Sequence, residues 1–215
     1  MNIYLLVFIY VLLVIAAIFA KLQKPQFYKY TKPLPILFLI VFFSMTSFGQ
    51  PHFSTWILLG LVGGLLGDIL LLKDSLFIPG ALAFLIGHIF YIVEFLQKPL
   101  IYDLYLFTSV AVVSVLYGLY LIRNIQRKKG LYGFVITAYI ACIYSMFITS
   151  MSFYLHEPSY FLIPLGAGVF MVSDAALSYG KFIRSSNMQE FIVSVTYYSA
   201  QLFIVFGYLR IPFTA

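Results

Sequence analysis

The sequence predicts an all-α fold, an integral membrane bundle of eight transmembrane helices. Three observations predict it: an apolar composition, eight apolar runs, and loops too short to fold by themselves. Of the 215 residues, 63% are hydrophobic and only 9% are charged, and the mean hydropathy is +1.01. Soluble domains have about a quarter of their residues charged, so this chain lacks the polar surface of a water-soluble protein. We therefore expect a multi-pass protein with a single transmembrane domain over residues 1–215.

Each apolar run is close to the ~20 residues that a helix needs to cross the hydrocarbon of a bilayer. The first has no basic segment before it and no small-residue cleavage site before Lys21, which indicates a retained helix and not a signal peptide. Pro33 and Pro35 open the second run, as the first turn of a helix tolerates proline. The predicted spans are residues 3–20, 34–48, 55–72, 77–96, 104–122, 131–150, 159–180 and 189–209.

The basic residues predict the orientation of the chain. A formal charge of +6 would suggest nucleic acid as the partner of a soluble protein, but here the charges lie in short loops and we expect no nucleic acid. Loops after the first, third, fifth and seventh spans hold eleven of the thirteen Lys and Arg residues, while Lys98 and Arg210 lie on the other side. By the positive-inside rule both termini are non-cytoplasmic, and we expect the bacterial inner membrane. The single cysteine, Cys142, permits no intrachain disulfide.

Two aspartates interrupt the apolar runs. Asp68 lies within residues 60–73 and Asp174 within residues 166–182. A carboxylate in a membrane span is costly, so its default interpretation is functional. Each aspartate follows a glycine by eight residues and precedes a leucine by three, which suggests a parallel four-plus-four repeat. Both would lie roughly 7–11 Å from the cytoplasmic helix ends, so we expect the two carboxyl groups to face one another.

The alternative role for these aspartates is structural. Gly60 and Gly64 form a GxxxG pair, as do Gly63 and Gly67, and such pairs usually serve close helix packing. Asp68 continues the Gly60–Gly64 stripe and should therefore face protein, where it could be an interhelical hydrogen-bonding group. We favour a functional role because no Lys or Arg within the spans is available to pair with either carboxylate.

Other polar residues in the spans are weaker candidates. A lone buried histidine such as His88 is more often a satisfied polar group than a catalytic one, and the tyrosines and Gln201 more often form interhelical hydrogen bonds. Glu94 and Glu157 lie near outer helix ends, as do His52 and His156, and we expect these four to be solvated. The remaining candidates for substrate binding are His88, Tyr91, Tyr139, Tyr197 and Gln201, with Tyr144 as a further polar residue of the same kind.

A metal site is not expected, because zinc sites draw together three or four His, Cys, Asp or Glu ligands and only Asp68, Asp174 and His88 could meet. The chain also lacks a G-x-S-x-G elbow, a P-loop and a dinucleotide fingerprint. We therefore expect no cofactor.

Five short motifs lie in order on the second, third, fourth, seventh and eighth predicted spans. They are TKPLP (31–35), GDILL (67–71), FLIGHIFY (84–91), GAGVFMVSDAAL (166–177) and YYSAQLFI (197–204). Together they resemble the YhhN/lysoplasmalogenase family of multi-span membrane proteins. The resemblance implies hydrolysis of the vinyl ether bond of lysoplasmalogens to a fatty aldehyde and a glycerophospho-base, with a lysophospholipid substrate drawn from the membrane.

The residues suit this chemistry independently. Vinyl ether hydrolysis needs an acid that protonates the β-carbon and a carboxylate that stabilises the oxocarbenium ion and activates water, as in glycosidases. Asp68 and Asp174 would take these two roles, and their sequence neighbours do not decide between them. Lys32, at the mouth of the second span, is the candidate contact for the substrate phosphate, or else one more lysine of the positive-inside pattern.

Two other functions remain open. Paired intramembrane acids and a four-plus-four repeat also suit a proton-coupled or lipid-related transporter, although both aspartates lie away from the midplane where such sites sit. A lipid-binding structural protein could use the aspartates for packing alone. Release of aldehyde from a lysoplasmalogen would distinguish the hydrolase from both.

Overall fold

The computed structural model describes residues 3–50, 53–101, 103–124 and 129–211, with the side chains of residues 129–132 left aside. The described residues form helices joined by short turns and loops, and contain no strand. Two short 3-10 turns, Asp74–Leu76 and Pro158–Tyr160, precede α5 and α8. The α-helices are α1 (Ile3–Gln23), α2 (Pro25–Thr31), α3 (Leu34–Ser47), α4 (Thr55–Leu70), α5 (Phe77–Phe95), α6 (Leu104–Asn124), α7 (Lys129–His156), α8 (Leu162–Phe182) and α9 (Asn187–Tyr208).

Every predicted span coincides with a helix, but their lengths differ. Within the described residues, seven helical segments are long and apolar enough to cross a membrane. Helix α4 is the exception, because its 16 residues extend only about 24 Å at the α-helical rise. The multi-pass, all-helical prediction is therefore confirmed, whereas eight full-length spans are not.

Two boundaries differ from the sequence-based expectation. The stretch after the first span, expected to be a loop, contains α2. Pro25 lies in the first turn of this helix, where backbone N–H groups have no partner within the helix and the missing N–H of proline costs nothing. Helix α7 extends to His156, six residues beyond the predicted end of its span, since nothing before Glu157 and Pro158 stops it. At the start of α4, by contrast, Ser54 caps the helix by accepting a hydrogen bond from the Ile57 amide.

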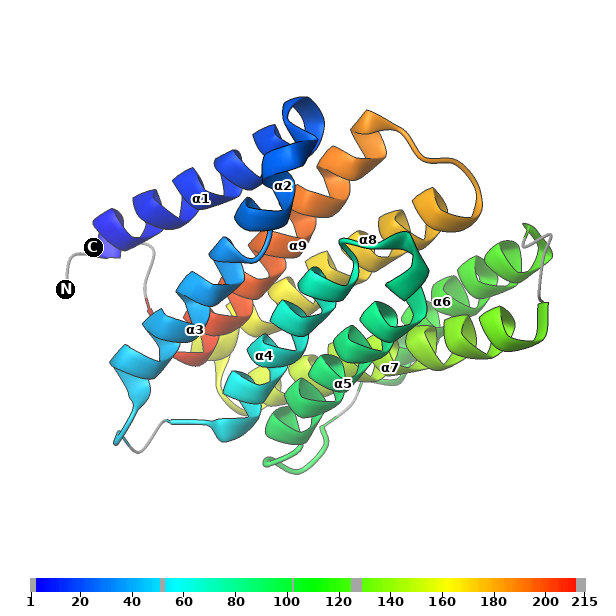
Figure 1. Ribbon diagram of the computed structural model, residues 1–215. Coiled ribbons are helices and arrows are strands. Elements are labelled where there is room, and N and C mark those ends of the chain that lie inside the picture. Colours follow the sequence, from blue (N-terminus) through cyan, green and yellow to red (C-terminus); the bar gives the residue numbers. More distant parts are fainter. Residues whose placement is uncertain (1–2, 51–52, 102, 125–128, 212–215) are drawn as a thin grey trace.

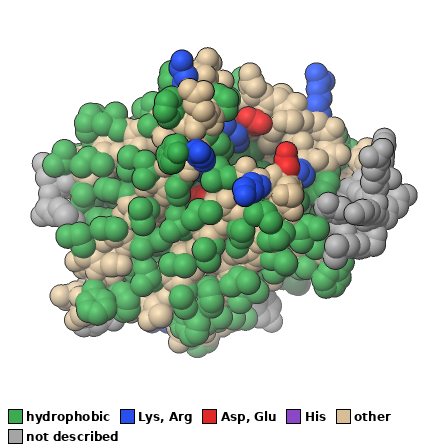
Figure 2. Space-filling view, viewed as in Figure 1, with side chains coloured by type: hydrophobic (Ala, Val, Ile, Leu, Met, Phe, Trp, Pro, Cys, Tyr) green, Lys and Arg blue, Asp and Glu red, His purple; other side chains and the backbone are tan. Residues whose placement is uncertain are grey.

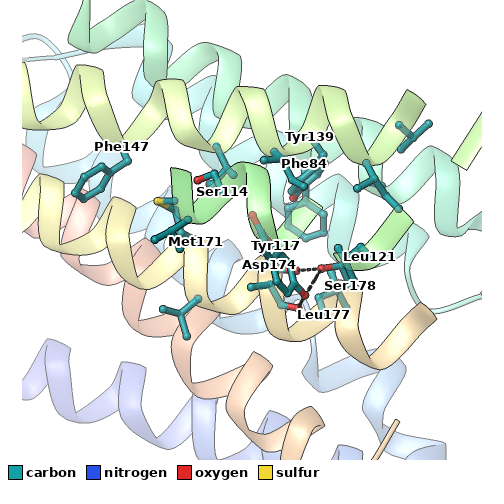
Figure 3. A pocket seen from close by; sticks show the side chains of 18 of the residues that line it. Phe84, Ser114, Tyr117, Leu121, Tyr139, Phe147, Met171, Asp174, Leu177 and Ser178 are labelled. Atoms are coloured by element: carbon teal, nitrogen blue, oxygen red, sulfur yellow. Dashed lines mark hydrogen bonds between the residues drawn. The ribbon is translucent and has the colours of Figure 1, made fainter. Parts of the chain in front are cut away.

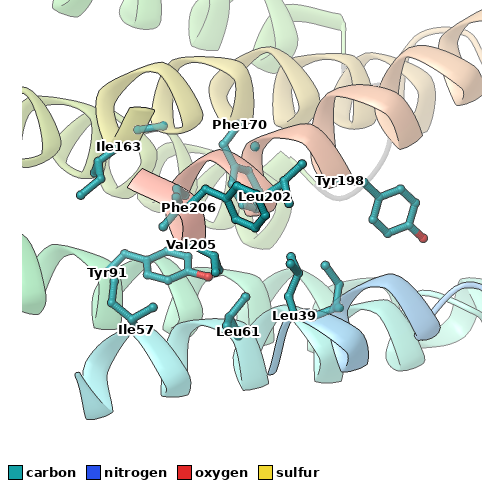
Figure 4. Close-up of a cluster of buried hydrophobic side chains, with 14 of the residues drawn as sticks. Leu39, Ile57, Leu61, Tyr91, Ile163, Phe170, Tyr198, Leu202, Val205 and Phe206 are labelled. Carbon is teal, nitrogen blue, oxygen red and sulfur yellow. The ribbon is translucent and has the colours of Figure 1, made fainter. Parts of the chain in front are cut away.

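The helices form an antiparallel bundle whose centre is α9 (Figure 1). In its apolar stretch 56% of the residues are buried, against 17% in α1 and in α6, which lie at opposite edges. Helix α9 packs closely along α8, and α4 along α5. Between these two pairs lies the main hydrophobic core, where Leu39, Ile57 and Leu61 face Val205 and Phe206 (Figure 4).

Glycines let α4 and α5 approach closely, as the GxxxG pairs predict. A Cβ atom on Gly63 would lie 2.7 Å from the Gly87 Cα atom, too close for any side chain. A Cβ on Gly60 would overlap the ring of Tyr91, and one on Gly67 the ring of Phe84. These contacts place the α5 side chains against the face of α4 that carries Asp68.

A second, smaller apolar cluster lies apart from the main core. Leu121 on α6 and Ile136 on α7 form it, with Tyr117, Ile140 and Phe182 packed against them. Helix α6 packs chiefly on α7 and only lightly on α8. The outer helix is therefore joined to the bundle at this cluster, and space remains between it and α8.

Charged side chains on the visible face gather at one end of the molecule, above apolar flanks (Figure 2). The turn between α1 and α2 and the connections from α4 to α5 and from α8 to α9 lie at this end (Figure 1). Lys21 and Lys181 lie in the last turns of α1 and α8, and Lys73 and Arg184 lie in the connections that follow α4 and α8. All four belong to the basic set used to predict orientation. The distribution is that of a protein with one strongly basic membrane face.

Candidate active site

A polar cavity of about 420 Å³ opens at the basic end of the bundle, and both aspartates line it. Asp74 and Ser185 at its mouth are exposed, and the walls come from α1, α2, α4, α5, α8 and α9. The predicted residues Lys32 and Tyr197 also line it. Cations and carboxylates share the cavity: the charged residues in its lining are Lys21, Lys32, Asp68, Asp74, Asp174, Lys181 and Glu190.

Asp68 has two polar partners. Its side chain is 2% exposed, and the Tyr197 hydroxyl donates a hydrogen bond of 2.9 Å to Oδ2. The Nζ atom of Lys32 lies 3.6 Å from Oδ1. The ammonium therefore offers a counter-charge to an ionised Asp68, and the phenol stabilises it by a charge-assisted hydrogen bond.

The pair corrects one premise of the sequence analysis, that no basic residue within the spans could pair with either aspartate. Lys32 follows α2 directly and is only 8% exposed. The Tyr198 hydroxyl donates a 2.9 Å hydrogen bond to the Lys32 carbonyl, and the Tyr28 ring lies 5.8 Å from Nζ. Helix α2 turns Lys32 back into the bundle, which an extended loop would not do.

Asp174 has fewer polar partners than Asp68. It lies on α8 with 9% of its surface exposed, and His88 Nε2 is 3.7 Å from Oδ2, beyond hydrogen-bonding distance. The rings of Phe170 and Tyr139 are edge-on to the imidazole, with distances of 4.6 and 5.6 Å between the ring centroids. The only basic side chain paired with Asp174 in the described part of the chain is this buried histidine.

Unused hydrogen-bonding groups surround Asp174. Among the described residues, neither ring nitrogen of His88 has a hydrogen-bond partner, nor does the Tyr139 hydroxyl, nor Oδ2 of Asp174. Buried polar atoms are nearly always paired, so such a group next to a cavity indicates a place where a ligand or water binds. Among the described residues no protein group satisfies the His88 imidazole by a hydrogen bond, so its role stays a prediction.

Tyr91 and Gln201 lie behind this site. The Tyr91 hydroxyl donates a 2.7 Å hydrogen bond to Oε1 of Gln201, and both side chains are fully enclosed. Neither belongs to the lining of the polar cavity. Tyr144, the further polar candidate, forms an interhelical hydrogen bond, because its hydroxyl donates to the Phe107 carbonyl.

Glu94 corrects a further expectation. It was expected to be solvated, but it is 7% exposed, and both carboxylate oxygens accept hydrogen bonds, one from Ser54 and one of 2.6 Å from Tyr208. Residues from three helical ends meet there, which no local sequence pattern indicates. His156 and Glu157 are exposed or partly exposed as expected, while His52 lies outside the described residues.

An apolar cavity of about 490 Å³ adjoins the polar one (Figure 3). It lies between α5, α6, α7 and α8, and Asp174 and Tyr139 are among its few polar lining residues. Asp174 lines both cavities, together with Leu71, Phe77, Phe84 and Leu177. Nothing in the sequence indicates this cavity or its α6 wall, since the apolar runs of α6 and α7 look like ordinary lipid-facing helices.

No group of three or more His, Cys, Asp or Glu residues in the described ranges could hold a metal ion. Asp68 and Asp174 contribute to the site with different partners, and no contact joins their side chains in the described hydrogen bonds and ion pairs. Both residues line the polar cavity, and that their carboxyl groups face one another stays a prediction.

Comparison with known proteins places this site in a family. Residues 27–208 match the model of the YhhN family, a stretch that contains α3 to α9 and most of α2. The chain belongs to the YhhN family. Asp68, Asp174, Lys32 and His88 all lie within the matched residues.

Curated relatives of this family member are mammalian. The chain is 32% identical over 179 residues to the lysoplasmalogenase TMEM86B of Mus musculus, covering 83% of this chain and 74% of the relative. It is 29% identical over 191 residues to the lysoplasmalogenase TMEM86B of Homo sapiens, covering 88% and 79%. No solved structure matches the chain significantly.

Proposed function

We propose that this protein is a membrane hydrolase that cleaves the vinyl ether bond of lysoplasmalogens, releasing a fatty aldehyde and a glycerophospho-base. The observation that carries the proposal is the position of Asp174, which lines both a polar cavity with three lysines and an apolar cavity. In a lysoplasmalogen the vinyl ether joins the polar glycerophosphate part to the hydrocarbon chain. A substrate that fills both cavities brings this bond to the aspartate. The names of the curated relatives support the same substrate class.

The surroundings of the two aspartates favour one division of roles. Asp174 has no Lys or Arg partner among the described residues, so a proton on it avoids an unpaired buried charge. We assign it the transfer of a proton to the β-carbon of the vinyl ether, with His88 and Tyr139 positioned beside it. Asp68, held by Lys32 and Tyr197, is suited to the ionised role.

The proposed reaction consumes one water. Protonation of the β-carbon leaves an oxocarbenium ion, whose charge the Asp68 carboxylate stabilises as it accepts a proton from the attacking water. The hemiacetal that forms then breaks its bond to the glycerol oxygen, which takes a proton, while the carbonyl of the aldehyde forms. The proton that Asp68 has taken up then passes to Asp174 through the cavity that both residues line, so each returns to its starting protonation state. No step calls for a metal or cofactor.

The remaining site residues receive supporting roles in this proposal. Lys32 lines the polar cavity beside Asp68 and contacts the substrate phosphate, in addition to its pairing with Asp68. Tyr197 reaches the cavity directly, whereas Tyr91 and Gln201 act through the hydrogen bond that links α5 to α9. Cytoplasmic-leaflet lipid would enter at the basic end.

The test is incubation of the purified protein with a lysoplasmalogen and, in parallel, with the matching ester lysolipid. We expect free aldehyde from the vinyl ether substrate alone. Fatty acid from the ester would indicate a different hydrolase. Solute uptake into liposomes, with no aldehyde from either lipid, would favour the transporter and overturn the proposal.

We further propose that all eight helical runs cross the membrane, as one transmembrane domain with both termini non-cytoplasmic. Helix α4 joins the end of α3 at one side of the bundle to the start of α5 at the other, which a partial crossing would not achieve (Figure 1). The shared aspartate spacing suggests a four-plus-four repeat. A reporter active only in the cytoplasm, fused after the last helix, should be silent. The bacterial inner membrane stays a prediction, since the named relatives are mammalian.

A further inference from the structure

The apolar cavity is elongated along α8. Its lining on that helix runs from Gly168 to Phe182, which corresponds to about 21 Å at the α-helical rise. Phe147 and Met171 lie at one end, and Leu121, Leu177 and Ser178 toward the other (Figure 3). Asp174 lies between these ends, so one arm of the cavity extends from it toward Phe147.

This arm leads away from the basic end. Gly168 precedes Asp174 by six residues, or about 9 Å along α8, in the direction opposite to Lys181. Its walls are Ile143 and Phe147 from α7, Val110 and Val113 from α6, and Met171 from α8. A chain attached to a polar group at the basic end would pass Asp174 and continue into this arm.

Gly168 keeps the far part of the arm open. A Cβ atom added there would meet only the Phe147 ring, at 3.4 and 3.8 Å, which is ordinary van der Waals contact. The position therefore faces space on the cavity side, and Phe147 is the wall opposite it. Most other glycines of the bundle differ, because added Cβ atoms would overlap their neighbours.

We propose that this arm binds the hydrocarbon chain of a single-chain ether lipid, and that Gly168 and Phe147 set the chain length that the protein prefers. The proposal rests on the proposed function and adds the determinant of its specificity. Lipid tails are as apolar as the cavity, so transfer from the bilayer contributes little to the choice between chains. Selection must come from fit at the Gly168–Phe147 end of the arm, where additional methylene groups would meet the Phe147 ring.

The test measures binding without catalysis. Saturated alkyl ether lysophospholipids lack the vinyl ether and cannot undergo the proposed hydrolysis. A homologous series of them is titrated onto the purified full chain in detergent, and the length with the highest affinity is recorded for each variant. Gly168→Leu places a side chain in the arm and should move the preference to shorter chains by about two carbons or more, with severalfold weaker binding of long ones.

Phe147→Ala removes the wall and should move the preference in the opposite direction. Phe147 also packs against the main core, so Phe147→Leu serves as a milder variant if the alanine protein is unstable. Gly133→Leu is the matched control, because the same change there enters open space on α7, outside the cavity lining. It should leave the preferred length unchanged.

The results separate this proposal from the proposed function. Opposite shifts in folded Gly168→Leu and Phe147→Leu proteins support the chain site, even if no aldehyde is released from lysoplasmalogen. An unchanged preference in both variants, or an equal shift in Gly133→Leu, overturns the chain site, even if the wild-type protein releases aldehyde.

Discussion

Asp68 and Asp174 occupy equivalent places in their helices but very different surroundings. Each follows a glycine by eight residues and precedes a leucine by three. Asp68 has a lysine and a tyrosyl hydroxyl as partners, whereas Asp174 faces a histidine and a tyrosine whose polar atoms have no hydrogen-bond partners among the described residues. Residues on other helices create this difference. The comparison teaches that a repeated local pattern predicts burial, and that tertiary contacts decide the chemistry each carboxyl group can perform.

The largest expected effect comes from removing either carboxyl group. Asp174→Asn cannot donate the proton, and Asp68→Asn cannot stabilise the cation or activate water, so each should lower kcat by roughly a hundredfold or more. The double variant should lose much less than the product of the two losses, since groups that act as a unit fail together. The measurement is aldehyde release by folded protein. Near-normal turnover in either variant would return that aspartate to a packing role.

The difference between the two sites also predicts a pH dependence. The rate should fall at low pH as Asp68 becomes protonated and at high pH as Asp174 loses its proton, by on the order of tenfold per pH unit on each side. Initial rates across a buffered series with a stability check at each pH test this. A profile with a single limb would show that only one of the two carboxyl groups titrates in turnover.

Variants of Lys32 distinguish its two proposed roles, as the charge partner of Asp68 and as the contact for the substrate phosphate. If it only contacts phosphate, Lys32→Gln should raise KM with little change in kcat. Because its Nζ lies 3.6 Å from Asp68, we expect kcat to fall as well, by about tenfold. Lys32→Arg keeps the charge and should restore most of kcat. Unchanged kinetics in a folded Lys32→Gln protein would leave Lys32 as only one more lysine of the positive-inside pattern.

The smallest effect should come from the layer behind the site. Tyr91→Phe removes the hydroxyl that bonds to Gln201 and keeps the ring that fills the space beside Gly60. We expect a loss of roughly 1 kcal/mol in stability and no change in KM. Thermal unfolding of the Tyr91→Phe protein in detergent measures this loss of stability, with the His88→Phe protein as the comparison. His88 has no hydrogen bond to lose, so its variant should lose activity and keep stability.

The sequence was sufficient for the helical runs, since apolar length and basic loops are local properties. It also indicated that Asp68 faces protein, because the glycine stripe on its helix continues to it. It did not indicate the Lys32–Asp68 pair, which depends on the turn made by α2. Nor did it indicate the buried Glu94, whose partners Ser54 and Tyr208 come from distant segments. Nor did it indicate the apolar cavity, which depends on how the whole of α6 is placed relative to α8.

The light packing of α6 on α8 has a consequence for what happens after the bond breaks. The apolar cavity includes the exposed Val113 and Val172 in its wall, so it opens toward the lipid, while the polar cavity opens at Asp74 and Ser185. In the proposed reaction the fatty aldehyde would diffuse sideways into the bilayer, and the glycerophospho-base would leave into water. Products that depart into different phases would not accumulate together at the site, and the polar cavity would not retain a reactive carbonyl.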